Sequence, residues 1–390
     1  MEDVKVDDSF EKYSDVMGSY MKEFHHVEFY VVNAVQTAQV YCILYGFEMY
    51  AICREDSGVV RYAIRNGPVI LVFCSKVGLK DKEWDNHIIK HGDSIKDIAF
   101  KVNDIDKVID LLKKHIDNKH ITGVSIEESI FHNGKCIGYR IQYDSSDIVH
   151  TLYDPSRFDG FFLPGFMCFE PNVCQNLPKA IEYLALDHVV QNHHEGTLEK
   201  VADYYKKSLG LNRFWSIDDK TCHSEYSAMN AWLVVNVSKE VQMTIAEPVT
   251  GTRRGRGQIQ EFLDFHGGPG IQHLALRVEN IIETVTNLKK RGVQFLSIPD
   301  EYYYDLKERL KGHYIKIYEN LDDLQRLNIL VDFDDKGYLL QIFTKPVQDR
   351  PTLFLEIIQR ENFNGFGAGN FKSLFEALEA EQKKRGTLFC

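Results

Sequence analysis

An internal repeat constrains the fold of this chain more than any other feature, because two copies of one unit must adopt the same architecture. Residues 97–105 and 273–281 share a pattern of apolar and polar side chains at a constant offset of 176 residues. Each copy begins with an apolar run typical of a strand, followed by a short turn and an amphipathic segment with paired lysines. The pattern predicts a strand, a turn and a helix in each half of the chain.

A second pair of similar segments begins at His26 and at His188. In each segment a strand precedes a helix, which we place at 36–44 and at 198–208, and a glycine follows within two residues as the expected helix C-cap. Strand-rich segments come after both helices. The two pairs together predict an α+β fold of four βαβββ modules, two in each half.

These modules set the expected domain boundaries. Residues 24–155 should form a first, structural domain, residues 156–183 a linker, and residues 184–390 a second domain that ends in a helix. A glycine-rich stretch with three phenylalanines, residues 363–371, precedes that last helix. Aromatic side chains beside mobile glycines are costly unless they cover something apolar, so a lid is favoured over a helix that docks on the surface.

Composition excludes several functional classes. The chain has 44% hydrophobic and 26% charged residues, as folded globular proteins do, and its net charge of −11 argues against a nucleic-acid partner. It contains no apolar run of 18 residues, so no membrane span is expected, and its first residues lack the apolar core of a secretory signal. The eight cysteines form no CxxC pair, which favours free thiols in a reducing cytoplasm.

The repeat also selects candidate metal ligands among fifteen histidines. His188 and His273 stand at the same place in the first strands of the third and fourth modules. Glu356 interrupts an apolar strand near the end of the fourth module, and a buried carboxylate needs a partner such as a metal. Two imidazoles and one carboxylate form the facial triad that suits Fe(II) and leaves positions open for substrate and O₂. Catalytic zinc also accepts this ligand set, but no HExxH motif is present.

The first half serves as an internal control for this interpretation. It has His26 at the first ligand position but Asp97 at the second, and it shows no clear counterpart of Glu356 near residues 151–153. The sequence therefore predicts a metal site in the second half only. The first half keeps a complete core pattern, so a role in an interface is expected for it, within a homodimer or homotetramer.

Four long stretches resemble the 4-hydroxyphenylpyruvate dioxygenase family, which has the vicinal-oxygen-chelate fold, and the resemblance extends from about residue 24 to residue 388. The stretches are Asn212–Asp219, Gly268–His273, Gly337–Glu356 and Gly365–Phe371. The resemblance implies two glyoxalase-like domains and an Fe(II)-dependent dioxygenase of tyrosine catabolism. Such an enzyme converts 4-hydroxyphenylpyruvate, an aromatic 2-oxo acid, and O₂ to homogentisate and CO₂.

The resemblance also implies roles for individual residues. It makes His188, His273 and Glu356 the iron ligands. It places amides and one aromatic ring next to the reacting groups, namely Gln258, Gln272, Gln341 and Phe343. It assigns the aromatic wall, the gate and the residue before the gate to Phe354, Phe366, Phe371 and Asn370.

Three positions depart from the family pattern. The family has proline and asparagine where this chain has Thr244 and Ala246, and a pocket serine where it has Ala231. Losing one buried hydrogen bond to a substrate costs roughly 1–3 kcal/mol, so two losses could change the substrate. The alternatives are the family reaction, another 2-oxo acid such as phenylpyruvate or indolepyruvate, and benzylic hydroxylation as in hydroxymandelate synthase. A catalytically silent relative that only binds a ligand is a further alternative.

Overall fold

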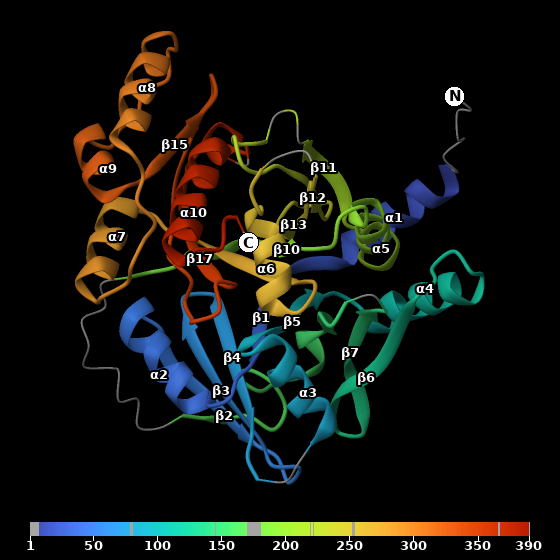
Figure 1. Cartoon of the computed structure of the whole chain (residues 1–390). Helices are drawn as coiled ribbons and strands as arrows, with labels where there is room; N and C mark the ends of the chain where they lie inside the picture. The colour runs from blue at the N-terminus through green and yellow to red at the C-terminus, as the bar shows by residue number, and fades with distance from the viewer. Residues whose placement is uncertain are drawn as a thin grey trace.

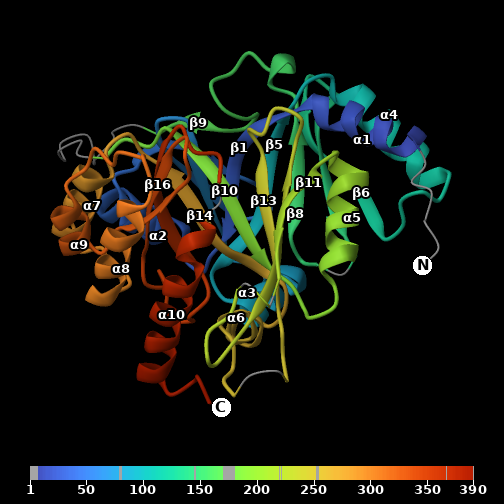
Figure 2. The same cartoon turned by 90° about the horizontal axis from the view of Figure 1, so that it is seen from above.

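The computed structural model describes residues 8–78, 81–144, 146–169, 181–218, 220, 222–251, 254–365 and 367–389. The chain folds into two curled sheets with helices packed around them (Figures 1 and 2). The elements of the first half are α1 (Asp8–Tyr20), β1 (Met21–Tyr30), α2 (Ala34–Tyr45), β2 (Glu48–Arg54), β3 (Val59–Asn66), β4 (Val69–Lys76), α3 (Lys82–His91), β5 (Ser94–Val102), α4 (Ile105–Asp117), β6 (Val124–His132), β7 (Lys135–Tyr143), β8 (Val149–Tyr153), η1 (Pro155–Arg157) and β9 (Met167–Cys168).

The elements of the second half are β10 (Ala185–Asn192), α5 (Leu198–Leu209), β11 (Asn212–Ile217), β12 (Met229–Val235), β13 (Gln242–Pro248), α6 (Gln258–His266), β14 (Gly270–Arg277), α7 (Ile281–Lys290), α8 (Asp300–Lys311), α9 (Leu321–Leu327), β15 (Leu330–Phe333), β16 (Tyr338–Phe343), β17 (Phe354–Glu361), η3 (Ala368–Asn370) and α10 (Phe371–Arg385). The first sheet has the order β6-β7-β8-β5-β1-β4-β3-β2-β9, and the second has the order β11-β12-β13-β10-β14-β17-β16-β15.

The four predicted βαβββ modules are confirmed. Each module supplies one strand, one helix and three further strands, and the first strands of two modules, β1 with β5 and β10 with β14, pair antiparallel at the centre of each sheet. The two predicted helices of the first and third modules end as expected. Gly46 and Gly210 follow them with φ of 76° and 65°, a left-handed conformation that glycine adopts without steric cost.

Five helices were not predicted, namely α1, α3, α6, α8 and α9. Helix α1 lies in an N-terminal segment that has little apolar periodicity of its own. It is held by the second half instead, where Met17 is fully buried and the Tyr13 hydroxyl donates to the carbonyl oxygen of Lys207 at the end of α5. Figure 1 shows α1 beside α5. Tertiary contacts of this kind cannot be read from local sequence.

The two faces of the second sheet have different roles. Val189 of β10 and Leu274 of β14 point to the face covered by α5 and α7, and they belong to one hydrophobic core that extends through both halves. Alternate residues on the same strands point to the opposite face, because side chains alternate along a strand. That opposite face, called here the site face, carries His188 and His273 and is bordered by α6 and α10.

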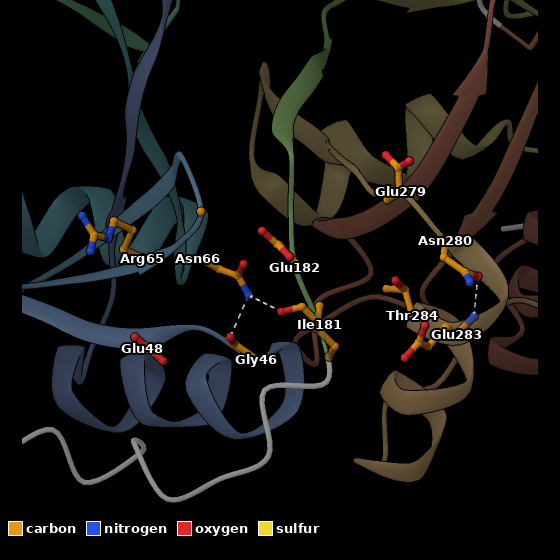
Figure 3. Close-up of a pocket in the computed structure, with 11 residues that line it drawn as sticks. Gly46, Glu48, Arg65, Asn66, Ile181, Glu182, Glu279, Asn280, Glu283 and Thr284 are labelled. Atoms are coloured by element: carbon orange, nitrogen blue, oxygen red, sulfur yellow. Dashed lines mark hydrogen bonds between the residues drawn. The ribbon is translucent and has the colours of Figure 1, made fainter.

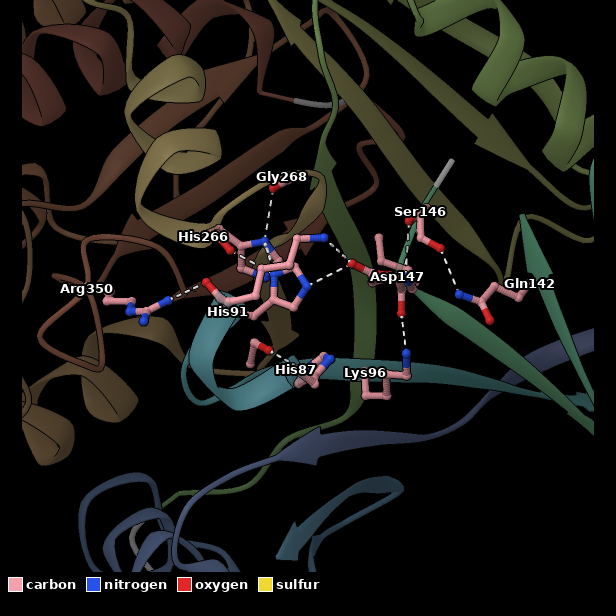
Figure 4. Close-up of polar contacts among 12 residues, drawn as sticks. His87, His91, Lys96, Gln142, Ser146, Asp147, His266, Gly268 and Arg350 are labelled. Atoms are coloured by element: carbon pink, nitrogen blue, oxygen red, sulfur yellow. Dashed lines mark hydrogen bonds and ion pairs between the residues drawn. The ribbon is translucent and has the colours of Figure 1, made fainter. Parts of the chain in front are cut away.

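The halves also meet through a histidine contact between α3 and α6 (Figure 4). The Nδ1 atom of His91 lies 2.7 Å from the carbonyl oxygen of His266, and its Nε2 atom lies 2.9 Å from Asp147 Oδ2. Arg350 of the second half donates to the carbonyl oxygen of Lys90 at 2.7 Å.

No helix in the described part of the chain is long and apolar enough to cross a membrane.

Candidate metal centre

Strand register brings the three candidate ligands together. His188 pairs with Ala275 across β10 and β14, and Ala275 pairs with Glu356 across β14 and β17. Paired residues share a face, so His188 and Glu356 lie in one row with the small Ala275 between them. His273 lies in the neighbouring row, where it pairs with Val190. Three strands far apart in the sequence therefore direct two imidazoles and one carboxylate to a common point.

The distances among these groups are short. Glu356 Oε2 lies 3.2 Å from His188 Nε2 and 3.3 Å from His273 Nε2. One ligand atom from each residue falls within a cluster 4.8 Å across, and all three side chains are buried. Within the described residues this is the only group of three or more such side chains that could hold a metal ion.

Neighbouring side chains hold both imidazoles in the required tautomer. His188 Nδ1 donates to Asp187 Oδ1 at 2.9 Å, and His273 Nδ1 donates to Gln272 Oε1 at 3.0 Å. With Nδ1 held as the donor in each ring, Nε2 is the nitrogen that faces the cluster and would coordinate a metal ion. Gln272, expected to line the substrate pocket, thus contacts a candidate ligand.

Asp187 is itself held by a partly buried arginine that sequence reasoning missed. Arg360 Nε donates to Asp187 Oδ2 at 2.9 Å and Arg360 Nη2 donates to Oδ1 at 2.8 Å, a two-bond pairing. Arg360 also donates to the carbonyl oxygens of Phe363 and Gly365, just before η3. The position of Asp187 directly before His188 was the one sequence signal for this support.

The electrostatics of the cluster are those of a site prepared for a cation. Burial alone would lower the pKa of His188, but Glu356 and Asp187 raise it to about 9. Burial would raise the pKa of Glu356, but the two histidines lower it to about 2. Burial lowers the pKa of His273, so the proton that compensates the buried carboxylate sits on His188, and a bound cation would take over its role.

The donor set fits a catalytic metal. Two neutral imidazole nitrogens and one carboxylate oxygen on one face leave further coordination positions open, as non-haem Fe(II) sites require, and zinc accepts the same set. The hydrogen bonds to both Nδ1 atoms supply the outer support that such sites have.

Aromatic side chains form a wall beside the cluster. The ring of Phe354 stacks on His273 with centroids 4.7 Å apart and an interplanar angle of 23°. Phe343 approaches His273 edge-on at 6.0 Å, and it pairs with Glu356 across β16 and β17. Both phenylalanines are buried. They give the cluster an apolar side suited to an aromatic ring.

The predicted amides lie at different places around this wall. Gln341 lies on the same strand face as Phe343, and its amide packs against Gly367, where a Cβ atom would fall 2.4 Å from Gln341 Oε1. Asn370 is fully buried and accepts a hydrogen bond from the Tyr302 hydroxyl at 2.8 Å. Gln258 is the first residue of α6 and is partly buried. Phe366 lies outside the described residues.

The two alanines that depart from the family pattern are direct neighbours. Ala231 and Ala246 pair across β12 and β13, and each is at most 3% exposed. They belong to an apolar cluster that also contains Phe375 of α10, with Phe371 packed against it. This part of the site face therefore offers methyl groups and rings where two hydrogen-bonding side chains were expected.

A surface pocket lies away from the cluster. It has a volume of about 750 Å³ and is situated between the halves, where Asn66 Nδ2 donates to the carbonyl oxygens of Gly46 and Ile181 (Figure 3). Glu48 and Glu279 are among its lining residues, but none of the three candidate ligands is. The buried cluster, where three potential metal ligands converge, is therefore the candidate site, and this pocket is not.

Comparison with known proteins gives consistent relatives. Residues 185–342 match the model of the Glyoxalase/Bleomycin resistance protein/Dioxygenase superfamily. A 4-hydroxyphenylpyruvate dioxygenase from Danio rerio is 46% identical over 94% of this chain and 92% of its own length. A Caenorhabditis elegans protein whose name states no activity is 46% identical over 96% of this chain and 100% of its own length. Among solved structures, a triple mutant of 4-hydroxymandelate synthase from Streptomyces coelicolor has a TM-score of 0.77 at 29% identity, covering 93% of this chain and 99% of that one.

Proposed function

The chain belongs to the 4-hydroxyphenylpyruvate dioxygenase family, and from that premise we propose that it converts 4-hydroxyphenylpyruvate and O₂ to homogentisate and CO₂. The observation that carries the proposal is the buried cluster of His188, His273 and Glu356 beside two phenylalanine rings. A catalytically silent relative could have lost any of these residues without penalty. All three are present, and hydrogen bonds fix both imidazoles.

The metal we propose is Fe(II), held by these three residues in the second half, residues 184–390. When bound, Fe(II) supplies the redox chemistry that activates O₂ and a point of attachment for the 2-oxo acid. Zinc would serve as a Lewis acid only, and the oxidation of an aromatic ring needs a redox-active metal. The first half, residues 24–155, is a structural domain in this proposal, with residues 156–183 as the linker.

The protein's own residues position the substrate and exclude water. Asp187 and Gln272 hold the two imidazoles, so their orientation does not have to be set during turnover. Phe343 and Phe354 contact the aromatic ring of the substrate. Burial by α10 keeps bulk water from the reacting atoms.

The remaining amides complete the proposed pocket. Gln341 and Gln258 offer hydrogen bonds to the polar groups of the substrate. Asn370 keeps its Nδ2 donor without a hydrogen-bond partner among the described residues, so it is available as well. Phe371 and Phe366 close the pocket in this proposal, as the gate implied by the resemblance.

A second candidate is benzylic hydroxylation of the same substrate to 4-hydroxymandelate. Ala231 and Ala246 favour it, because a ring without hydrogen bonds at its far end is free to shift relative to the metal. Without these hydrogen bonds, burying the ring hydroxyl of 4-hydroxyphenylpyruvate costs free energy. The pocket would therefore also accept phenylpyruvate, which has no ring hydroxyl.

Product analysis distinguishes these outcomes. The protein is reconstituted with Fe(II) and ascorbate and given 4-hydroxyphenylpyruvate while O₂ uptake is recorded. Homogentisate and 4-hydroxymandelate are isomers, so the products are separated by chromatography against standards before mass spectrometry. Homogentisate supports the first candidate and 4-hydroxymandelate the second. Absence of O₂ uptake with every aromatic 2-oxo acid would overturn both.

Matched variants separate chemistry from folding. His188→Gln should abolish O₂ uptake, whereas His26→Gln, at the equivalent place in the first half, should leave it intact. Adding back polar groups with Ala231→Ser and Ala246→Asn should raise kcat/KM for 4-hydroxyphenylpyruvate relative to phenylpyruvate by tenfold or more. An unchanged ratio would show that this part of the pocket does not contact the ring hydroxyl.

We also propose that the protein works in the cytoplasm and as a homodimer or homotetramer. Six cysteines in the described part of the chain are free, which suits a reducing compartment. Fractionation tests the first point, and sedimentation velocity of the full chain tests the second.

A further inference from the structure

The first half contains a cavity at the place that corresponds to the metal cluster of the second half. His26 pairs with Ala99 across β1 and β5, as His188 pairs with Ala275. The parallel register of β5 and β8, with Phe100 opposite Leu152, puts Thr151 beside Ala99. Thr151 is therefore the structural counterpart of Glu356, which the sequence alone did not reveal.

The three first-half counterparts cannot form a metal site. Asp97 replaces the second histidine, and both of its oxygens accept hydrogen bonds from Thr151, one from the backbone nitrogen and one from the hydroxyl. Arg140 pairs with Thr151 as Phe343 pairs with Glu356, so a guanidinium stands where the second half has an aromatic ring. A cation beside the ligands would repel a metal ion.

The cavity itself has a volume of about 160 Å³. That is below the range of about 300–1,000 Å³ typical of sites for drug-sized ligands. Its lining includes the charged residues Arg61, Arg140 and Glu28 and the apolar residues Leu163 and Phe166. It could therefore hold a metabolite with only a few non-hydrogen atoms.

Two charged groups of this cavity have unused hydrogen-bonding capacity. Arg140 approaches Glu28 Oε1 at 3.6 Å and Asp97 Oδ2 at 3.9 Å, both beyond hydrogen-bond distance, and no hydrogen bond from its guanidinium is found in the described part of the chain. Glu28 Oε1 is buried and accepts no hydrogen bond there either. Glu28 Oε2, by contrast, lies 3.4 Å from Arg61 Nε. A donor set and an acceptor thus stand side by side, each without a hydrogen bond.

The charge balance limits what can bind. Arg61 and Arg140 face three carboxylates, those of Glu28, Glu55 and Asp97. A lone anion would meet too many carboxylates, and a lone cation would leave Arg140 with its two ion pairs but without a hydrogen bond. A ligand that carries both charges on adjacent atoms satisfies both groups at once.

We propose that this first-half cavity binds a small α-amino acid, whose carboxylate pairs with Arg140 and whose ammonium group pairs with Glu28. The apolar wall at Leu163 and Phe166 accommodates a short side chain, and the volume excludes an aromatic one. The site is separate from the metal cluster, so it does not depend on the proposed dioxygenase activity.

Direct binding to the full, metal-loaded chain tests this proposal. Isothermal titration with glycine, alanine and serine should give saturable binding, whereas acetate, methylamine and tyrosine should bind at least tenfold more weakly. Equal binding of acetate or of methylamine would overturn the proposal in favour of a simple ion site. Absence of binding of all three amino acids at millimolar concentration would show that the charged wall is only an internal ion network.

Variants locate the site. Arg140→Gln and Glu28→Gln should each weaken alanine binding about tenfold or more, because each removes a charge-assisted hydrogen bond. Arg157→Gln is the matched control, since Arg157 pairs with Asp106 outside the cavity. If Glu28→Gln fails to fold, Arg140→Gln still tests the proposal. The side chain of Arg140 is one-third exposed, so its substitution should be tolerated by the fold. Binding that both cavity variants leave unchanged would refute the assignment.

Discussion

The ion pair behind His188 allows a quantitative test of how the cluster is supported. Asp187→Asn keeps an oxygen that can accept from His188 Nδ1 but removes the charge opposite Arg360. The two side chains are 1% and 12% exposed, and breaking a buried pair by removing one partner costs about 3–5 kcal/mol. Arg360 keeps its hydrogen bonds to Phe363 and Gly365. We therefore expect a loss of stability near the lower bound, about 3 kcal/mol.

The same substitution should weaken metal binding. Mutation of an outer partner of a ligating histidine typically lowers metal affinity about 10–100-fold, and Asp187→Asn removes the carboxylate charge while it keeps an acceptor oxygen. Anaerobic titration calorimetry with Fe(II) measures the affinity, and the thermal midpoint reports the stability. Glu261→Gln is the control, because the buried Glu261 pairs with Arg385 at 2.8 Å and forms no hydrogen bond with the three candidate ligands in the described part of the chain. Equal stability losses in both variants with metal affinity unchanged in Asp187→Asn would refute the supporting role.

Three further predictions follow from single features. Chelation should lower the thermal midpoint, since metal at a hundredfold excess over its Kd stabilises the native state by about 2.7 kcal/mol, and a midpoint that ignores chelator would refute native-state metal binding. Gly367→Ala should lower kcat, because Gly367 has φ of +72° and a Cβ atom would clash with Gln341; unchanged kcat would show that Gln341 has room to move. Burial lowers the pKa of His266 from 6.5 to about 3, so the unfolded chain binds a proton that the folded chain does not. Stability should therefore fall as the pH drops below about 6.5, and His266→Phe should flatten this part of the profile measured by chemical denaturation.

The repeat made much of the fold predictable. The strand, helix and glycine signals of 26–46 and 188–210 recur, so each copy supported the interpretation of the other. The same comparison selected His188 and His273 among many histidines. Local sequence could not reveal α1, whose burial depends on contacts with α5, a segment almost two hundred residues away.

The counterpart of Glu356 was missed for a different reason. The offset between the halves is 176 residues at His273, but it has grown to 205 at Glu356, whose partner is Thr151. The fourth module contains α8 and α9 between its first helix and its next strand, and the second module has no such insertion. An alignment at constant offset therefore loses register before the third ligand. Arg360 was missed because its partner, Asp187, lies on a strand remote in sequence.

The register of the first half also predicts what a single change there cannot do. Asp97→His would restore the second imidazole in the row next to that of His26, but Thr151 offers a hydroxyl where Glu356 offers a carboxylate, and Arg140 brings a positive charge to the row of His26 and Thr151. Two imidazoles without a carboxylate and beside a guanidinium should not hold Fe(II), so we expect the variant to bind no more metal ions per chain than the parent. Adding Thr151→Glu and Arg140→Phe supplies the missing carboxylate and removes the repulsion. A second bound metal ion in Asp97→His alone, measured by elemental analysis after anaerobic loading, would show that strand register is a poor guide to the equivalence of the two halves.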